Sequence, residues 1–581
     1  MKSMLRPQLA AGMLAVAAIV SLRATVLAQD KAAKIDQLIS LYSKYGEFNG
    51  SALVADNGRV VLKKGYGLAN MEWNIPNGPD TKFRLGSITK QFTATLILQL
   101  VEQGKIKLDG KIVDYLPDYR PDTGAKVTIH NLLSHTSGIP NYTALPGFFQ
   151  NVSRNPFAVD DFIKKYGSGD LEFEPGTKFV YSNTNYFLLG AIVEKVTGKK
   201  YEDVLKEKIF DPAGMKNTGY DHWSTIMDKR ATGYTKTPAG YENAPYLDMS
   251  IPYAAGSLYS TVEDLYLWDQ ALYSDRVLSA TSKELMFKPN LNDYGYGFFM
   301  RKISLGPNKF QVPVIQHNGG INGFATTIVR MPGDKRLVVL LDNTEQGLHL
   351  DQIATRVMSI LYDQPYDPPQ RSIADLLLST IVKQDVASAV KQYREWKAGP
   401  SAAEYNFAET ELNTLGYRLL QMRKTADAIE IFKLNVERYP QSFNAYDSLG
   451  EAYRAHGDKE LAVANYKKSL ELNPQNTNAT AKLAALSNEQ KEVKIDPKIY
   501  QAYAGEYELG PGFTVTISSE NGKLMGQPTG QAKLELFPSS ETEFSLRVVD
   551  AQVTFVKDAQ GKVTELILNQ NGRKMTAKKI H

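Results

Sequence analysis

Two β-hairpin signals, more than 250 residues apart, set the strongest limit on how this chain folds. Residues 50–62 read GSALVADNGRVVL, with an Asn-Gly pair between two apolar runs, and residues 324–342 hold a Pro-Gly pair between two further strand-like runs. Such pairs favour tight turns between strands. Helical patterns and long loops fill the chain between the hairpins. We therefore expect one α+β domain over residues 30–363, whose antiparallel sheet is flanked by helices and joins segments distant in the sequence.

A proline-rich break at residues 362–372 ends this pattern, and a 34-residue period follows it. Three pairs of residues are separated by that period: Gly416 and Gly450, Phe432 and Tyr466, Pro440 and Pro474. A period of this length, with small residues inside helix pairs, is typical of tetratricopeptide repeats. We expect helical repeats over residues 373–490, with 383–396 as a degenerate first unit. They would bind a protein or peptide partner in their concave face, or serve only as a spacer.

The last part of the chain changes character again. From about residue 495, apolar and polar residues alternate around Asn-Gly and Gln-Gly turns, which predicts a small antiparallel β domain over residues 495–581. We interpret the basic tail, residues 572–581, as a solvated edge strand of this domain.

The N-terminus has the features of a secretory signal peptide. Lys2 and Arg6 precede a 14-residue apolar run at residues 9–22, and small residues suited to cleavage end at Ala28. The run is short for a membrane span, although an uncleaved anchor is the alternative. We expect a signal peptide over residues 1–28, no stable membrane span after its cleavage, and a periplasmic or secreted bacterial protein.

The charge balance and the absence of cysteine exclude several classes of site. Lys and Arg number 67 against 63 Asp and Glu, so the net charge of +4 creates no strong field for nucleic acid. No cysteine is present, which excludes disulfides, thiolate nucleophiles and cysteine-ligated metals. His130, His222 and His349 have no partners at metal-ligand spacing, so we expect neither a metal nor a cofactor.

The stretch FRLGSITKQF contains the first candidate for chemistry. Ser87 stands three residues before Lys90, and apolar residues at helical spacing follow, so both side chains share one face near a helix N-terminus. A serine needs a base to become a nucleophile. Lys90 can be that base if burial lowers its pKa.

Two further motifs follow along the chain. Tyr181 and Asn183 lie in a Tyr-Ser-Asn triplet before a helix-like run, and His317 begins His-Asn-Gly-Gly just before a predicted strand. A phenol can relay a proton, an amide can orient lysine and substrate, and strand-edge N–H groups can stabilise an oxyanion. Taken alone, Tyr181 also fits a packed core tyrosine and His317 a structural histidine.

The order Ser-x-x-Lys, Tyr-Ser-Asn and His-x-Gly, with LLSHTSGIP and AAGSLYSTVEDLYLW beside them, resembles the serine β-lactamase and penicillin-binding-protein-like hydrolases. Within these hydrolases, the sequence is similar to class C β-lactamases, family VIII carboxylesterases and D-aminopeptidases over about residues 38–363. The resemblance implies a β-lactamase/transpeptidase-like fold, often followed by tetratricopeptide repeats and a small β domain.

The resemblance also implies roles for individual residues. Ser87 would be the acylated nucleophile, Lys90 its general base and Tyr181 the proton carrier for the leaving group and water. Asn183 would orient Lys90, and the backbone N–H groups of Ser87 and Gly320 would form the oxyanion hole, with Gly319 beside them. His317 stands where β-lactamases of this type have the lysine of Lys-Thr-Gly, and neutral histidine is a weaker anchor for an antibiotic carboxylate.

We therefore expect a secreted serine hydrolase, esterase-like or D-aminopeptidase-like, that cleaves esters or amides through an acyl-enzyme on Ser87. The alternatives are a β-lactamase or D,D-peptidase, and a non-catalytic peptide or peptidoglycan binder. Ser134 and His135 offer a rival serine–histidine pair, but adjacent residues seldom face each other, so we interpret them as a buried turn.

Overall fold

A computed structural model describes residues 29–345, 347–489, 495–510, 513–546, 551–570 and 573–580. The predicted signal peptide, residues 1–28, lies outside the described residues. The chain divides into two compact units, Met1–Arg371 and Ser372–His581, and each is described by itself. In the part of the chain that the structure describes, no helix is both long and apolar enough to cross a membrane.

The first unit is built on a six-stranded antiparallel sheet in the order β10-β11-β12-β13-β1-β2. The strands are β1 (Gly50–Asp56), β2 (Arg59–Tyr66), β10 (Phe299–Leu305), β11 (Phe310–Ile321), β12 (Phe324–Met331) and β13 (Arg336–Asp342). Both predicted hairpins are confirmed, as β1–β2 and β12–β13. The two hairpins join where Gly50 of β1 faces Asp342 of β13, so the sheet does unite distant segments.

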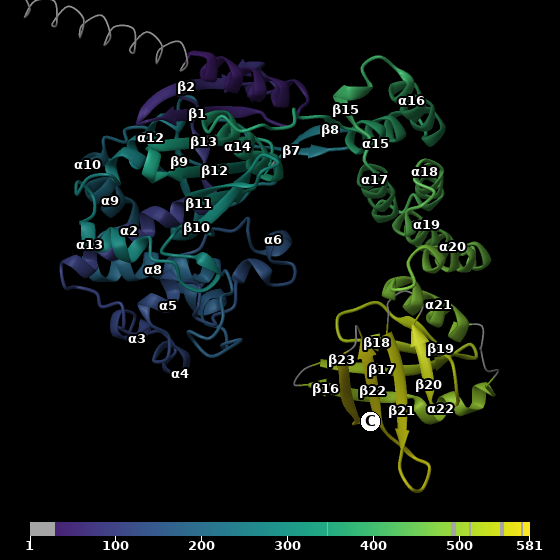
Figure 1. The fold of residues 1–581 in the computed structure, drawn as a ribbon. Coiled ribbons are helices and arrows are strands. Elements are labelled where there is room, and N and C mark those ends of the chain that lie inside the picture. The colour runs from purple at the N-terminus through teal and green to yellow at the C-terminus, as the bar shows by residue number, and fades with distance from the viewer. Residues whose placement is uncertain are drawn as a thin grey trace, which may run out of the picture. The chain divides into compact units, whose positions relative to one another are not determined.

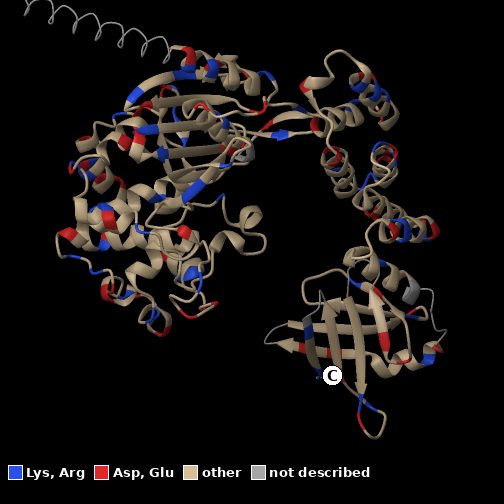
Figure 2. Cartoon of the chain, viewed as in Figure 1, with Lys and Arg blue, Asp and Glu red and all other residues tan. Residues whose placement is uncertain are grey.

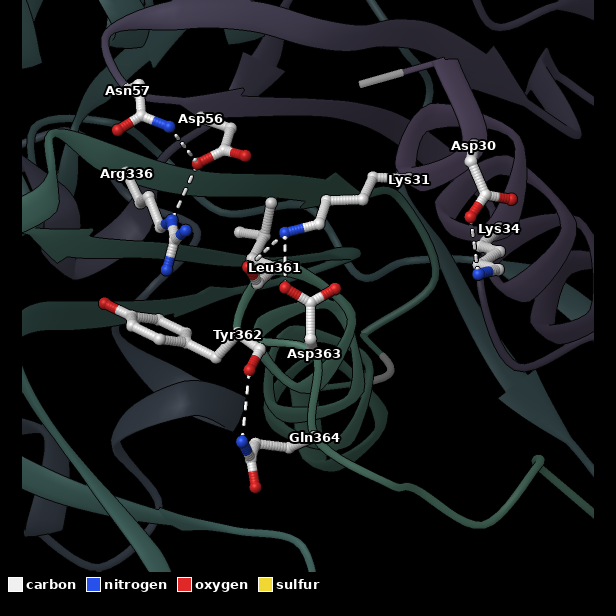
Figure 3. Close-up of polar contacts among 10 residues, drawn as sticks. All are labelled: Asp30, Lys31, Lys34, Asp56, Asn57, Arg336, Leu361, Tyr362, Asp363 and Gln364. Carbon is white, nitrogen blue, oxygen red and sulfur yellow. Dashed lines mark hydrogen bonds and ion pairs between the residues drawn. The ribbon is translucent and has the colours of Figure 1, made fainter. Parts of the chain in front are cut away.

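Helices cover both faces of this sheet (Figure 1). On one face, the helix of residues 29–44 and α14 (Gly347–Leu361) bury apolar side chains against β1, β12 and β13. Lys31 ties these two helices together, because its Nζ donates to Leu361 O at 2.7 Å and to Asp363 at 3.0 Å (Figure 3). On the other face, the core contains α2 (Thr89–Glu102), α8 (Asn183–Thr197) and α12 (Val262–Ala271).

The larger helical layer also contains short elements that shape the site. They are η1 (Gly86–Ile88), α5 (Ile129–Leu133), α9 (Tyr201–Leu205), α11 (Tyr253–Gly256), α13 (Ala280–Met286) and a three-stranded sheet of β5 (Phe83–Arg84), β9 (Leu258–Ser260) and β6 (Gly219–Tyr220). Basic and acidic residues are interspersed over the ribbon of this unit, as the nearly balanced composition implies (Figure 2).

The second unit begins with seven helices, of which the first six form three pairs and the seventh packs on α20. They are α15 (Ile373–Lys383), α16 (Val386–Ala398), α17 (Glu409–Gln421), α18 (Thr425–Arg438), α19 (Phe443–His456), α20 (Lys459–Leu472) and α21 (Thr477–Glu489). The 34-residue period has a packing cause. A Cβ on Gly416 would lie 2.4 Å from the Phe432 ring, and one on Gly450 would lie 2.9 Å from the Tyr466 ring. Each glycine therefore lets the first helix of a pair pack directly against an aromatic ring of the second helix.

The unit ends in a closed eight-stranded barrel. Its strands are β16 (Gly505–Gly510), β17 (Phe513–Glu520), β18 (Lys523–Pro528), β19 (Leu534–Pro538), β20 (Glu543–Leu546), β21 (Ala551–Lys557), β22 (Val563–Gln570) and β23 (Arg573–Lys579). The prediction of an antiparallel β domain is confirmed, but the interpretation of the basic tail as an edge strand is wrong. β23 pairs with β22 on one side and with β16 on the other. Closure leaves this strand no free edge.

Candidate active site

Ser87 lies in η1, the single 3-10 turn that leads directly into the central helix α2. Gly86 before it has φ +54°, a left-handed conformation that favours glycine. Ser87 is half-buried and therefore accessible, whereas Lys90, one turn later, is 0% exposed. The predicted pair is thus brought together at the start of a buried helix.

Lys90 is held by three polar neighbours. Its Nζ lies 3.0 Å from Ser87 Oγ, and it donates to Asn183 Oδ1 and to Ala255 O, both at 2.8 Å. Burial lowers the pKa of Lys90 well below its usual 10.5. A neutral amine has two N–H groups and one lone pair. The two N–H groups donate to Asn183 Oδ1 and Ala255 O, and the lone pair is then free to accept the proton of the Ser87 hydroxyl.

Asn183 is the first residue of α8 and is fixed from three sides. Its side-chain oxygen accepts from Lys90, its Nδ2 lies 3.3 Å from Thr143 Oγ1, and its backbone N–H donates to Asn141 Oδ1 at 3.0 Å. These contacts set which way the amide faces, and hence where Lys90 Nζ is held.

Tyr181 forms a wall of the same site. The Lys90 Nζ lies 4.9 Å from the centroid of its ring. Burial raises the pKa of the Tyr181 phenol, and the nearby Ser87 hydroxyl lowers it by less, so the phenol is neutral at physiological pH. Its hydroxyl is buried and has no hydrogen-bond partner among the described residues. A substrate atom or water can take up this unused hydrogen bond.

His317 lies on β11, behind Tyr181, with 6.2 Å between the ring centroids. It is 3% exposed, and both ring nitrogens have protein partners. Nδ1 donates to Asn318 O at 2.6 Å, which leaves Nε2 to accept from the Tyr294 hydroxyl at 3.2 Å. Burial is the largest cause that lowers the pKa of His317, to about 3.

Gly319 and Gly320 bring β11 close to η1. A Cβ on Gly319 would lie 1.9 Å from Leu85 O, and one on Gly86 would lie 2.9 Å from Gly320 N. β10 pairs with β11 only as far as Gln316. Beyond that residue, one edge of β11 pairs with β12 and the other edge faces η1. The glycines therefore let η1 and β11 lie side by side at Gly86 and Gly320, next to Ser87.

The rival pair Ser134 and His135 does not form a serine–histidine contact. Ser134 Oγ donates to His130 O at 2.7 Å, and His135 Nδ1 accepts from the Ser182 backbone N–H at 3.2 Å. His135 is 0% exposed, and its ring lies 4.2 Å from that of Tyr181. The pair belongs to a buried turn, and its histidine packs against the ring of Tyr181.

Two residues of this site, Ala255 and Tyr294, were not identified from the sequence. Ala255 contributes a backbone oxygen, which no side-chain pattern reveals, although it lies within the quoted stretch AAGSLYSTVEDLYLW. Tyr294 binds His317 from a Tyr-Gly-Tyr-Gly run, in which Gly297 has φ +75° and no room for a Cβ beside Lys90 O. That alternation of tyrosine and glycine was the available signal.

Comparison with known proteins agrees with this arrangement. Residues 35–362 match the family described as Beta-lactamase, residues 443–476 match the Tetratricopeptide repeat, and residues 489–579 match a domain of unknown function, DUF3471. Penicillin-binding protein 4* of Bacillus subtilis is 27% identical over 550 residues, which cover 91% of this chain and 94% of that protein.

Two further relatives resemble the first unit. Teichoic acid D-alanine hydrolase of Staphylococcus aureus is 28% identical over 313 residues, covering 53% of this chain and 73% of that protein. The crystal structure of D-amino acid amidase from Ochrobactrum anthropi SV3 has a TM-score of 0.51 and 26% identity, and covers 57% of this chain and 99% of that one. Because the family match spans more than half of the chain and includes Ser87 and Lys90, the chain belongs to the beta-lactamase family of serine hydrolases, which act on amides and esters.

Proposed function

We propose that the protein is a secreted serine hydrolase that cleaves an ester or amide through an acyl-enzyme on Ser87, as an esterase or a D-aminopeptidase-like enzyme. One observation carries the proposal: a buried amine of lowered pKa lies 3.0 Å from an accessible serine hydroxyl. In that state Lys90 can accept the serine proton at neutral pH.

Acylation then proceeds in two proton movements. Ser87 Oγ attacks the carbonyl carbon while its proton passes to Lys90 Nζ. The resulting oxyanion accepts the N–H groups of Ser87 and Gly320, which the glycine contacts bring to adjacent backbones. The leaving group departs with a proton from the Tyr181 hydroxyl, and the Lys90 ammonium restores that proton to Tyr181.

Deacylation reverses the proton path. A water molecule attacks the acyl carbon while Tyr181 or Lys90 accepts its proton. That proton then passes to Ser87 Oγ as the acyl bond breaks, and the acid is released. Asn183 keeps Lys90 oriented throughout, because its side-chain oxygen accepts an N–H of that amine. His317 acts by fixing Tyr294 and the wall behind Tyr181, since both of its nitrogens are already bonded within the protein.

We further propose a division of labour along the chain. Residues 30–363 carry the chemistry, the helical repeats at 373–490 bind a protein or peptide partner, and residues 495–581 form an appended β domain. The bacterial relatives are penicillin-binding proteins and a teichoic acid hydrolase, which supports work outside the cytoplasm.

A β-lactamase or D,D-peptidase is the second candidate. The observation in its favour is the similarity to a penicillin-binding protein over almost the whole chain. The pKa of about 3 at His317 speaks against it, because a neutral, internally bonded imidazole is a poor anchor for an antibiotic carboxylate. A purely non-catalytic binder would have no use for a buried Lys90 against Ser87.

Intact-mass measurement separates these functions. We expect a fluorophosphonate to add one adduct, localised to Ser87, and a penicillin to add little. Turnover of p-nitrophenyl butyrate and of D-alanine p-nitroanilide should exceed that of nitrocefin. Absence of any fluorophosphonate adduct on folded protein would refute the serine hydrolase mechanism, and faster turnover of nitrocefin would favour the second candidate.

A further inference from the structure

A cavity of about 310 Å³ opens beside the site, where the chain enters η1 and where it leaves β11. Arg84 stands three residues before Ser87, and Asn322 stands two residues after Gly320, and both line the cavity. Two residues of extended chain span about 7 Å, so the cavity is within reach of a substrate bound at Ser87.

The charged side chains that line this cavity are mostly basic. They are Lys82, Arg84, Asp221 and Arg230. Asp221, whose side chain is 2% exposed, accepts from Arg84 Nε at 2.6 Å and from Arg230 Nη2 at 2.7 Å. Lys82 pairs with Asp228 at 2.9 Å. Three cations and one carboxylate line the cavity itself. Asp228, Asp248 and Glu72 lie outside the lining and bond to its residues Lys82, Tyr246 and Asn243. Within the lining, positive charge exceeds negative charge, which suits an anionic group of a ligand.

Two arginines that line the cavity also have N–H groups with no hydrogen-bond partner among the described residues. Within the described part of the chain, Arg84 makes its hydrogen bond through Nε alone, so both of its Nη groups remain free. Its side chain is 18% exposed, and its guanidinium lies over the Phe324 ring at 6.0 Å. The Arg230 Nε is buried and has no hydrogen-bond partner among the described residues. A guanidinium with free Nη groups matches the two oxygens of a carboxylate.

The direction of β11 decides which part of a substrate meets this cavity. Tyr181, which protonates the leaving group, lies beside His317, so the leaving group occupies that end of the strand. Gly320 lies three residues further, about 10 Å along an extended strand. Asn322 follows in the turn after β11, and Phe324, the first residue of β12, pairs with Ile321 at this end of the strand. The acyl portion, on the opposite side of the scissile bond, therefore points toward the cavity.

We propose that this cavity binds a carboxylate on the acyl portion of the substrate, through Arg84 with support from Arg230. The inference rests on the proposed acyl-enzyme on Ser87 and narrows its substrate class to esters or amides of acidic acyl groups. Asp221 acts as a positioning residue, because it holds both guanidinium groups from beneath.

Three matched esters test the proposal. p-Nitrophenyl hexanoate and mono-p-nitrophenyl adipate have acyl chains of equal length, but adipate ends in a carboxylate. The third, 3-carboxy-4-nitrophenyl hexanoate, has its carboxylate on the leaving group. We expect the wild-type kcat/KM to be higher for the adipate ester than for p-nitrophenyl hexanoate, mainly through KM, and the third ester to gain nothing.

Two variants of Arg84 and one distant control complete the experiment. Arg84→Gln should lower the adipate-to-hexanoate ratio of kcat/KM by about tenfold, as expected for loss of a charge-assisted hydrogen bond. Arg84→Lys should restore part of the ratio, because it keeps the charge and loses the fork of donors. Arg120→Gln should leave the ratio unchanged, because Arg120 pairs with Asp122 and Asp170 and does not line this cavity. Thermal unfolding of each variant verifies that it is folded.

The outcomes separate this inference from the proposed function. Hydrolysis of the hexanoate ester with an unchanged ratio in folded Arg84→Gln would overturn the carboxylate subsite and leave the serine hydrolase intact. A preference for the third ester would show that the enzyme binds a carboxylate on the leaving group, and it would also overturn the acyl-side carboxylate subsite. Failure of fluorophosphonate to label wild-type Ser87 would instead refute the proposed function.

Discussion

Lys90 Nζ lies 3.0 Å from Ser87 Oγ, and its other two hydrogen bonds go to acceptors, Asn183 Oδ1 and Ala255 O. Among the described residues the amine therefore has no carboxylate partner to keep it protonated, and its remaining position faces the serine. The proposed base and nucleophile are held together by a helix that is buried along its first three turns.

The first prediction concerns the nucleophile. Ser87→Ala should abolish hydrolysis of p-nitrophenyl butyrate and labelling by fluorophosphonate, with a change in unfolding free energy of about 1 kcal/mol or less, because only one small half-buried hydroxyl is lost. Ser134→Ala is the matched control, since Ser134 bonds to His130 O and Thr136 and belongs to the rival pair. Retention of activity in Ser87→Ala, or its loss in folded Ser134→Ala, would show that the wrong serine has been assigned.

The second prediction concerns Lys90. Because its pKa is lowered, kcat/KM should rise with pH as the amine loses its proton, and should reach its plateau well below pH 10.5. Lys90→Arg, which stays protonated, should lose activity by about 10² to 10⁴-fold. An acid limb whose midpoint lies near 10.5 would mean that Lys90 is charged in the resting enzyme.

The same lowered pKa has a consequence for stability. Between the folded pKa of Lys90 and about 10.5, the unfolded chain binds a proton that the folded chain does not, so unfolding becomes harder as the pH rises. Relative to Lys90→Met, the wild type should gain at most about 1.4 kcal/mol per pH unit in that window. Urea titrations of both proteins between neutral pH and about pH 10 measure this difference. A difference that does not change with pH would contradict the neutral amine.

The third prediction concerns His317. With a pKa of about 3, its imidazole stays neutral at neutral and mildly acidic pH. The ratio of kcat/KM for p-nitrophenyl butyrate to that for nitrocefin should therefore be high and constant between about pH 5.5 and about pH 7.5. A ratio that falls as the pH drops through about 6.5 would show that an imidazolium binds the antibiotic carboxylate.

His317 should also contribute to acid sensitivity. Its folded pKa is below the ordinary 6.5, so the unfolded chain takes up a proton first as the pH falls, and stability is lost between 6.5 and about 3. His317→Gln should lose less stability than wild type over that interval and show no pH-dependent difference above it. Parallel urea titrations on either side of pH 6.5 provide the measurement.

Much of the first unit could be predicted because its signals are local. The Asn57-Gly58 turn has positive φ at both residues, at +52° and +74°, and it joins β1 to β2 as expected. The Ser87–Lys90 spacing places both side chains on one face of a helical turn, and no long-range information is needed for that. Likewise, the 34-residue period reports the contact of Gly416 with Phe432.

The features that were missed depend on contacts between distant segments. Ala255 enters the site through a backbone oxygen 165 residues from Lys90. His317 was expected to face the substrate, yet Tyr294 and Asn318 bind both of its nitrogens. Closure of the barrel by β23 depends on its pairing with β16, at the opposite end of that domain. Alternation of apolar and polar residues predicts a strand but does not reveal its second neighbour.

The fourth prediction concerns architecture. Both apolar cores of the first unit are made from its own residues, and every proposed catalytic residue lies within it. Residues 29–371 produced alone should therefore fold and accept a fluorophosphonate on Ser87, with the Ser87→Ala version as control. Intact mass and thermal unfolding measure the two properties. A folded fragment that is not labelled would show that the second unit completes the active site.

The last prediction concerns the spacing of β11 and η1. Gly319→Ala would place a Cβ 1.9 Å from Leu85 O, so β11 must move away from η1, and the amides of Ser87 and Gly320 must separate. We expect kcat to fall by about 10² to 10³-fold, as when one oxyanion donor is lost. Gly320→Ala should cost far less, because a Cβ there meets nothing within 4 Å and its backbone N–H is retained.

Gly50→Ala separates loss of stability from loss of the oxyanion hole. Its Cβ would lie 1.8 Å from Leu341 O, in the same sheet but between β1 and β13, where no proposed catalytic residue lies. The Gly50 and Gly319 variants should both unfold at lower temperature, whereas only the Gly319 variant should lose kcat per folded molecule, as counted by fluorophosphonate titration. Equal kcat values in the two variants would mean that the approach of β11 to η1 serves stability alone, and that the oxyanion is stabilised elsewhere.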